Sequence, residues 1–167
     1  MSATHAGSAV ASAMQLVPGR PLHQSRDARG VVFEPLDAAA LAMQRNVHVV
    51  LSAPGAVRGN HYHRAQHEVT VVVGPARVAW RVAASATAPI ETVDVPAGAA
   101  WRFEFPPGIT HAFENTGRET QVLVAFASQP HDPANPDTFR DPLLEPRQAS
   151  GPSSSSSSGA APSTGSP

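Results

Sequence analysis

Two amino acids are missing from this sequence of 167 residues, and each absence excludes whole classes of chemistry. There is no cysteine, which excludes disulfides, thiolate nucleophiles and cysteine-ligated zinc or iron–sulfur sites. All 12 basic residues are arginine, which excludes lysine Schiff bases and covalent attachment of pyridoxal phosphate. Any metal ion must therefore be held by imidazole and carboxylate groups.

Long apolar runs and a strong net charge are also lacking. No stretch approaches the roughly 18 apolar residues of a membrane span. The formal net charge is -1 and the sequence pI is about 6.7, so there is no basic field for nucleic acid or anionic lipid. Residues 1–18 lack the charged start and apolar core of a secretory signal. We therefore expect a cytoplasmic protein that binds a small molecule, with no nucleic-acid or membrane partner.

Histidine is the residue type that the sequence concentrates in one place. The segment RGNHYHRAQHEV, 58–69, contains three imidazoles and a carboxylate. Side chains two apart in an extended strand share a face at a spacing of about 7 Å, so His61 and His63 can bind one metal ion. His111 follows a Pro-Pro-Gly turn and can supply a third nitrogen ligand from a neighbouring strand. Ligands so far apart in sequence require a sheet that folds back on itself.

The residues around these histidines resemble two motifs of the cupin superfamily. Gly55, the pair His61-x-His63, an acid a few positions later and Gly74 resemble the first motif. The segment PPGITHAFEN, 106–115, resembles the second motif, P-x-G-x-x-H-x-x-x-N. The resemblance implies an all-β fold, a single double-stranded β-helix that forms a jelly-roll barrel with a metal near its axis.

The fourth metal ligand is either His67 or Glu68. Strand alternation allows only one of the two side chains to face inward. A carboxylate balances the charge of a divalent ion better than a fourth neutral imidazole, which favours Glu68. The usual interval of the cupin motif, counted back from Gly74, favours His67. The sequence thus predicts a divalent metal site completed by one of these residues, and leaves zinc, iron, manganese and nickel open.

Alternation of apolar and polar residues predicts a chain of short strands, with the apolar and aromatic side chains in a core or a dimer interface. Strands are expected at 31–33, 46–52, 74–82, 90–96, 101–105 and on both sides of a turn at 115–117. One helical segment is expected at 37–44, with Asp37 as its cap. His48 is interpreted as a structural residue of its strand, and Asn115 as a turn residue.

The domain organisation follows from composition. The barrel is expected to span 21–145. A flexible N-terminal tail, 1–20, precedes it, and a Ser/Pro/Gly-rich tail, 146–167, follows it. The composition of the C-terminal tail predicts disorder, because it contains almost nothing that could form a core.

Other segments resemble enzymes that act on nucleotide sugars. RDARG, 26–30, is similar to the opening of deoxysugar epimerases related to the dTDP-4-keto-rhamnose 3,5-epimerase. The RGNHYH segment, the PPGITHAFENTG turn and DPANPDTF, 132–139, resemble the cupin domain at the C-terminus of capsular-polysaccharide nucleotide-sugar epimerases. That domain is a zinc-bearing C3 epimerase of a UDP-linked 4-keto-hexosamine. The resemblance implies that the metal ligands are His61, His63, Glu68 and His111.

The expected function is therefore epimerisation or isomerisation of a nucleotide-linked keto sugar. Inverting a carbon beside a ketone requires a base and a positive charge that stabilises the anion formed. The base stays unassigned, with His67 as a candidate. Candidates for binding a polar substrate at the barrel mouth are Arg58, Arg81, Arg102 and Glu104.

Two other functions stay open at this point. A non-haem Fe(II) oxygenase needs the same open positions beside histidines and a carboxylate. A regulatory cupin would bind a ligand without converting it. Because cupin barrels usually pair through edge strands, a homodimer is the expected state.

Overall fold

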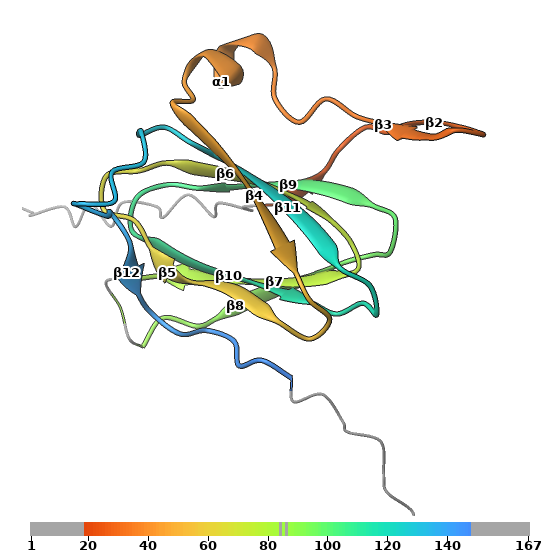
Figure 1. Ribbon diagram of the computed structural model, residues 1–167. Helices are drawn as coiled ribbons and strands as arrows, with labels where there is room; N and C mark the ends of the chain where they lie inside the picture. The colour runs from red at the N-terminus through yellow and green to blue at the C-terminus, as the bar shows by residue number, and fades with distance from the viewer. Residues whose placement is uncertain (1–18, 84, 86, 148–167) are drawn as a thin grey trace, which may run out of the picture.

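The computed structural model describes residues 19–83, 85 and 87–147. Figure 1 shows two β-sheets that face each other, with a short helix and a β-hairpin outside them. The predicted all-β fold is confirmed. Most of the two predicted tails lies outside the described residues. The first strand already begins at Gly19, inside the segment expected to be tail.

Each sheet contains five antiparallel strands, and the chain passes back and forth between the sheets. The first sheet has the order β1 (Gly19–Pro21), β9 (Ala100–Phe105), β6 (Glu68–Val73), β11 (Gln121–Ala127) and β4 (Asn46–Ser52). The second has the order β12 (Phe139–Arg140), β5 (Val57–Tyr62), β10 (Ile109–Asn115), β7 (Ala76–Val82) and β8 (Glu91–Val95). Among the described residues no strand pairing joins the two sheets, so the jelly roll is an open sandwich.

The hydrophobic core lies between the two sheets. Strand β9 illustrates how the alternating pattern builds it: Phe103 and Phe105 are buried between the sheets, whereas Arg102 and Glu104 point to the opposite face and pair with each other at 2.8 Å. The core cluster consists of Val72, Ala76, Val78, Val95, Phe103, Phe105, Phe113 and Leu123. The prediction that the aromatic residues form the core holds for both phenylalanines of β9.

The helix and the hairpin lie outside the sandwich (Figure 1). Helix α1 (Ala38–Ala42) begins where predicted, because the Asp37 carboxylate accepts the backbone N–H of Ala40 at 2.8 Å. Strands β2 (Ser25–Asp27) and β3 (Gly30–Val32) form the hairpin, and β3 overlaps the strand expected at 31–33. Across the described residues, no helix is long and apolar enough to cross a membrane.

Strands β5 and β10 approach each other closely where they carry histidines. His61 pairs with His111 in the register, and the register shifts between His111 and Ala112. Gly59, two residues before His61, has a φ of +80°, and a Cβ atom there would lie 2.7 Å from the His111 carbonyl oxygen. A glycine is therefore needed for this crossing, which brings two distant histidines side by side.

Candidate metal centre

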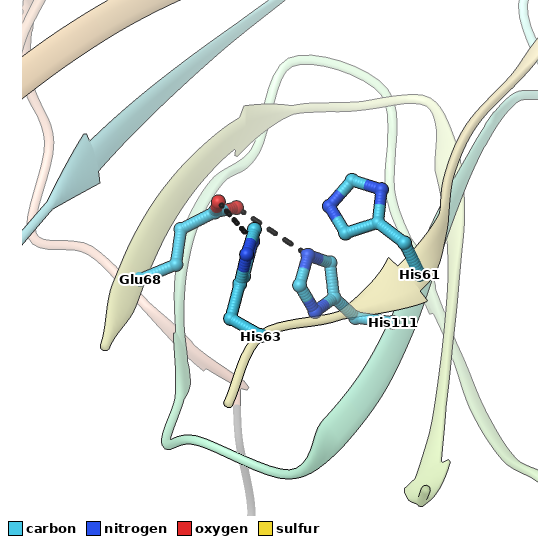
Figure 2. Close-up of side chains that lie close together, drawn as sticks. All are labelled: His61, His63, Glu68 and His111. Carbon is cyan, nitrogen blue, oxygen red and sulfur yellow. Dashed lines mark ion pairs between the residues drawn. The ribbon is translucent and has the colours of Figure 1, made fainter. Parts of the chain in front are cut away.

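Four side chains converge at one end of the sandwich (Figure 2). One nitrogen or carboxylate oxygen from each of His61, His63, Glu68 and His111 lies within 4.8 Å of the others. His61 lies in β5 and His111 in β10, two neighbouring strands of the second sheet, and His63 follows directly after β5. Glu68 is the first residue of β6 in the first sheet. The centroid of the His61 ring lies 4.9 Å from the centroids of both other rings. We call these four residues the His/Glu cluster.

Backbone carbonyl groups hold the three imidazole rings in one orientation. Nδ1 of His61 lies 3.2 Å from the Gly59 carbonyl oxygen, and Nδ1 of His111 lies 3.2 Å from the Ile109 carbonyl oxygen. Nδ1 of His63 is hydrogen-bonded to the Asp137 carbonyl oxygen. Because a carbonyl oxygen can only accept, each Nδ1 carries a proton, and Nε2 is the nitrogen of each ring that is left to act as a metal ligand. This is the tautomer that a metal-binding histidine needs.

The protonation states in the cluster follow from burial and from the neighbours. Burial, together with the nearby His111 and His63, lowers the pKa of His61 to about 4, so this ring is neutral at pH 7. Burial alone would lower the pKa of His63, but the Glu68 carboxylate and the Asp137 carbonyl outweigh it and raise that pKa. Burial alone would raise the pKa of Glu68, but contacts with His111 and His63 hold it well below its ordinary value. The carboxylate is therefore ionised.

The cluster fits a divalent cation. Nε2 of His111 is buried, lies 3.5 Å from Glu68 Oε1 and has no hydrogen-bond partner among the described residues. A buried nitrogen without a partner is costly, and a cation between the rings would satisfy it. The hydroxyl of Thr70 donates to Glu68 Oε1 at 2.7 Å and fixes the carboxylate from behind. Imidazole nitrogens with one carboxylate suit zinc, iron, manganese and nickel alike.

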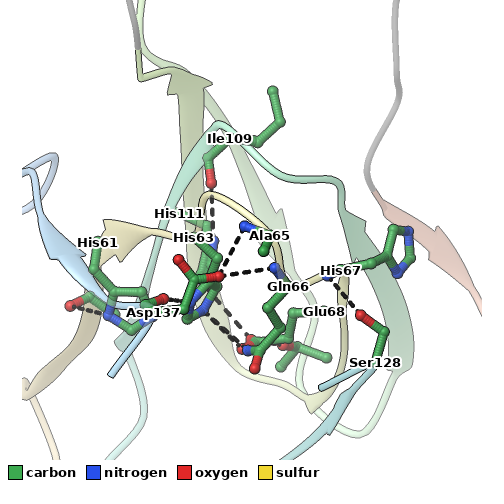
Figure 3. A network of polar contacts seen from close by, with 12 residues as sticks. His61, His63, Ala65, Gln66, His67, Glu68, Ile109, His111, Ser128 and Asp137 are labelled. Atoms are coloured by element: carbon green, nitrogen blue, oxygen red, sulfur yellow. Dashed lines mark hydrogen bonds and ion pairs between the residues drawn. The ribbon is translucent and has the colours of Figure 1, made fainter. Parts of the chain in front are cut away.

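Of the two candidates for the fourth position, the structure places Glu68 in the cluster. Its side chain is buried there, and its Oε2 lies 3.4 Å from His63 Nε2. The His67 ring points away from the cluster, as Figure 3 shows, and its backbone N–H donates to Ser128 Oγ at 2.9 Å. Strand alternation therefore separates the two residues as expected. The same orientation leaves His67 out of the cavity described next.

A cavity of about 690 Å³ opens above the cluster. His61, His63 and Glu68 form its floor, and residues 129–138, which we call the wall segment, contribute much of its side. A smaller cavity of about 60 Å³ lies against the other side of the cluster and reaches His111. The wall segment connects β11 of one sheet to β12 of the other. The sequence pattern predicts no strand or helix in this segment, and none of its residues was a candidate for the site.

His48 is a cavity residue that sequence reasoning set aside. It lines both cavities, together with His61 and Glu68. On β4 it alternates with Val47 and Val49, which are 55% and 61% exposed on the outer face of the sheet. This alternation could have identified His48 from the sequence. It did not, because the apolar side chains of Val47 and Val49 suggested that their face of β4, and not the face of His48, points into the protein. His131 of the wall segment lines the larger cavity as well.

The proposed substrate-binding residues are not all brought to the cavities. Arg58 lines the smaller cavity. Arg81 is instead paired with Asp141, and both side chains are largely buried. Arg102 and Glu104 pair with each other on the outer face of the first sheet, and Arg102 Nη1 also donates to the Pro35 carbonyl oxygen at 3.4 Å. The alternation of β9 carries these two side chains away from the cluster.

Comparison with known proteins places most of the described chain in one family. The sequence model of one protein family, the polysaccharide biosynthesis C-terminal domain, matches residues 25–139. A protein of Pseudomonas aeruginosa, UDP-2-acetamido-2,6-beta-L-arabino-hexul-4-ose reductase, is 31% identical over 120 residues. This match covers 71% of the present chain but 30% of the reductase, so the chain spans about a third of that relative.

Similar solved structures include proteins of polysaccharide and sugar biosynthesis. The capsular polysaccharide assembling protein CapF of Staphylococcus aureus is 27% identical with a TM-score of 0.55, over 74% of this chain and 33% of that chain. NovW of Streptomyces spheroides, a 4-keto-6-deoxy sugar epimerase, is 21% identical with a TM-score of 0.56, over 70% of this chain and 65% of that chain. The likeness to NovW establishes a shared fold.

Proposed function

The chain belongs to the family of polysaccharide biosynthesis C-terminal domains, and from this premise we propose that it is a metal-dependent enzyme that epimerises or isomerises a nucleotide-linked keto sugar. The observation that carries the proposal is the His/Glu cluster at the floor of a cavity of about 690 Å³. The names of two relatives support the substrate class, because one refers to a hexul-4-ose and the other to a 4-keto sugar.

His61, His63, Glu68 and His111 would hold the ion. When bound, the ion supplies positive charge beside a carbonyl oxygen of the substrate, which acidifies the neighbouring C–H bond. Glu68 contributes the negative charge that a divalent ion requires in a buried position. A histidine that binds a metal ion does so as a neutral imidazole, so the remaining charge of the ion stays available to the substrate. The side chains on the cavity wall then have to bind the sugar and transfer its proton.

We assign the proton transfer to His48. Its ring lines the cavity beside the cluster but is not a member of it, and it makes no side-chain hydrogen bond with the residues that the structure describes. An imidazole accepts and releases protons near neutral pH, which is what removal of a proton next to a ketone demands. Inversion also needs a donor on the other face of the carbon, and His131 on the wall segment is the candidate for that role.

The experiment that tests this function is hydrogen exchange in D₂O. The zinc-loaded protein is incubated with UDP-2-acetamido-2,6-beta-L-arabino-hexul-4-ose, and deuterium incorporation is followed by proton NMR. We expect deuterium at the carbon next to the ketone. The variant His48→Gln should lose the exchange by about 100-fold or more, the range for a general base, while it still binds zinc. Absence of exchange across a panel of nucleotide-linked keto sugars would reject the function.

The composition of the cluster also supports a second function, a non-haem Fe(II) oxygenase. Three imidazoles and one carboxylate leave open positions on an iron ion for O₂ and a substrate. Oxygen consumption with Fe(II) but not with Zn(II) distinguishes this activity from epimerisation, which should proceed with either ion. A protein that binds the sugar nucleotide without exchange or oxygen uptake would instead be a binding cupin.

We propose in addition that two copies of the chain associate through β4. This strand ends the first sheet, so its outer edge has no hydrogen-bonded neighbour among the described strands. Its outward side chains Val47, Val49 and Leu51 are apolar and are 55%, 61% and 62% exposed. An apolar edge strand of this length is usually covered. Light scattering of the purified protein tests the proposal, and the mass of a single chain would contradict it.

A further inference from the structure

Asp137, in the wall segment, contacts the loop that connects two members of the His/Glu cluster. This loop, residues 64–67, runs from His63 to Glu68 and is called the ligand loop below. The Asp137 carboxylate accepts three consecutive backbone N–H groups of the loop: Arg64 at 2.9 Å, Ala65 at 2.8 Å and Gln66 at 2.8 Å. Figure 3 shows the carboxylate facing the loop. The loop amides are thus held by one anion from a segment more than 70 positions away.

The main chain of the same residue holds His63. The Asp137 carbonyl oxygen accepts the proton of His63 Nδ1, so Nε2 is left to face the cluster. Three backbone N–H groups that converge on one carboxylate form a charge-assisted and geometrically specific contact. Because the side chain of Asp137 is fixed by the ligand loop, its carbonyl group is fixed beside the His63 ring. One residue therefore orders both the ring and the loop that follows it.

The N-terminal end of the wall segment is also attached to the ligand loop. Ser128, just before the segment, donates its backbone N–H to the His67 carbonyl oxygen at 3.0 Å and accepts the His67 N–H on Oγ at 2.9 Å. Beyond Asp137, Phe139 pairs with Tyr62 in the register of β12 and β5 and stacks on its ring. The segment that forms the side of the cavity is thus held at both ends by the strands and loop that carry the cluster.

We propose that Asp137 is a positioning residue that orients His63 toward the bound ion and links the cavity wall to the metal centre. The inference rests on the proposed function, because it takes His63 as a metal ligand. Asp137 would act through His63 and the ligand loop, because its carboxylate accepts from the loop amides and is not a member of the His/Glu cluster. Loss of the carboxylate should free the wall segment, withdraw the carbonyl group from Nδ1 and allow the His63 ring to turn.

Replacement of Asp137 tests this role through metal binding and not through turnover. The variants are Asp137→Ala, which removes all side-chain acceptors, and Asp137→Asn, which keeps one acceptor oxygen but loses the charge. We expect zinc affinity, measured by competition with a chromophoric chelator, to fall by about 10- to 100-fold in Asp137→Ala and by less in Asp137→Asn. The absorption spectrum of the Co(II)-substituted protein should change in the same order, because it reports the geometry of the ligands.

Asp132 provides the matched control. It lies in the same wall segment and lines the same cavity, but its carboxylate accepts from Ala134 and Asn135, both within the segment. Asp132→Asn should therefore leave zinc affinity and the Co(II) spectrum unchanged. If Asp137→Ala and Asp137→Asn also match the parent, the positioning role is wrong. If the parent protein itself binds no ion, the proposed function fails instead. Circular dichroism of the zinc-free variants verifies that both are folded.

Discussion

Glu68 is the single anion among three imidazoles, and its neighbours keep it ionised in a buried position. The substitution Glu68→Gln preserves the shape of the side chain but removes its charge. We expect zinc affinity to fall by at least about 100-fold, the upper end of what is lost when only an outer partner of a ligand is removed. Isothermal titration of the metal-free protein with zinc measures the change.

The adjacent residue supplies the control for this prediction. His67→Gln replaces an imidazole one position away whose ring points out of the cluster. Its zinc affinity should equal that of the parent protein. The assignment of the fourth ligand would be reversed if His67→Gln lost the metal and Glu68→Gln kept it.

The pairing of Asp141 with Arg81 should make the stability of the protein sensitive to acid, independently of the metal centre. Burial alone would raise its pKa, but hydrogen bonds from Arg81 and Thr110 outweigh burial and lower the pKa from its ordinary value of 3.8. The folded state then binds fewer protons than the unfolded state, so stability rises with pH in this range. The contribution of ionised Asp141 to the free energy of unfolding is fully present above about pH 3.8, the pKa of this group in the unfolded chain. It is lost as the pH falls through the lower pKa of the folded state.

Urea unfolding at about pH 6 and about pH 3 measures this contribution. Asp141→Asn cannot ionise and leaves the largely buried Arg81 without its partner. The variant should be less stable than the parent at the higher pH, and it should lose less stability on acidification, because other carboxylates still titrate in both proteins. An equal loss in both proteins would show that Asp141 does not carry the effect.

At the scale of the element, the crossing of β5 and β10 depends on Gly59. In Gly59→Ala, the new Cβ atom meets the His111 carbonyl oxygen at 2.7 Å, and the φ of +80° disfavours any side chain. The left-handed conformation costs about 1–2 kcal/mol and overpacking adds about 1–3 kcal/mol. We expect the free energy of unfolding to fall by roughly 2–5 kcal/mol, the sum of these two ranges, as measured by urea denaturation.

A substitution at Gly98 separates the cost of the left-handed backbone from the cost of overpacking. It has a φ of +72°, but nothing lies within 4 Å of the position of a new Cβ atom. Gly98→Ala should therefore cost only the conformational part, about 1–2 kcal/mol, and leave zinc binding intact. Equal destabilisation in the two variants would mean that the close approach of β5 to β10 carries no energy of its own.

The elements that the sequence predicted are those whose pattern is local. The strand 46–52 and the cap at Asp37 are confirmed at those positions, and alternation in β9 correctly separated Phe103 and Phe105 from Arg102 and Glu104. Strands β1 and β12 were missed, because two or three residues carry no periodicity and become strands only when a partner is present.

The metal cluster was predictable because its residues lie in two compact motifs. The cavity around it was not, because its side is formed by the wall segment, whose position depends on contacts more than 70 residues away in sequence. His48 was missed for a related reason. Alternation places it opposite Val47 and Val49, and only the assembled sandwich shows that the apolar side of β4 faces outward.

At the scale of the whole molecule, an ion in the His/Glu cluster would connect the two sheets. Three ligands come from the second sheet and Glu68 comes from the first. Because the unfolded chain cannot reproduce this arrangement, binding should stabilise the folded state by about 2.7 kcal/mol when the free ion is at about 100 times its dissociation constant. Removal of zinc with EDTA should lower the melting temperature, and Glu68→Gln should show a smaller change. A melting temperature unaffected by EDTA would contradict the metal site.

The division of the ligands between two sheets also has a consequence for when an ion could bind during folding. His61 and His111 meet when β5 and β10 pair, but the carboxylate of Glu68 arrives only when β6 of the opposite sheet has docked. A nascent chain with only the second sheet formed would thus offer an incomplete set of donors that lacks the carboxylate. Tight loading of the cofactor would then be confined to chains whose sandwich is already assembled.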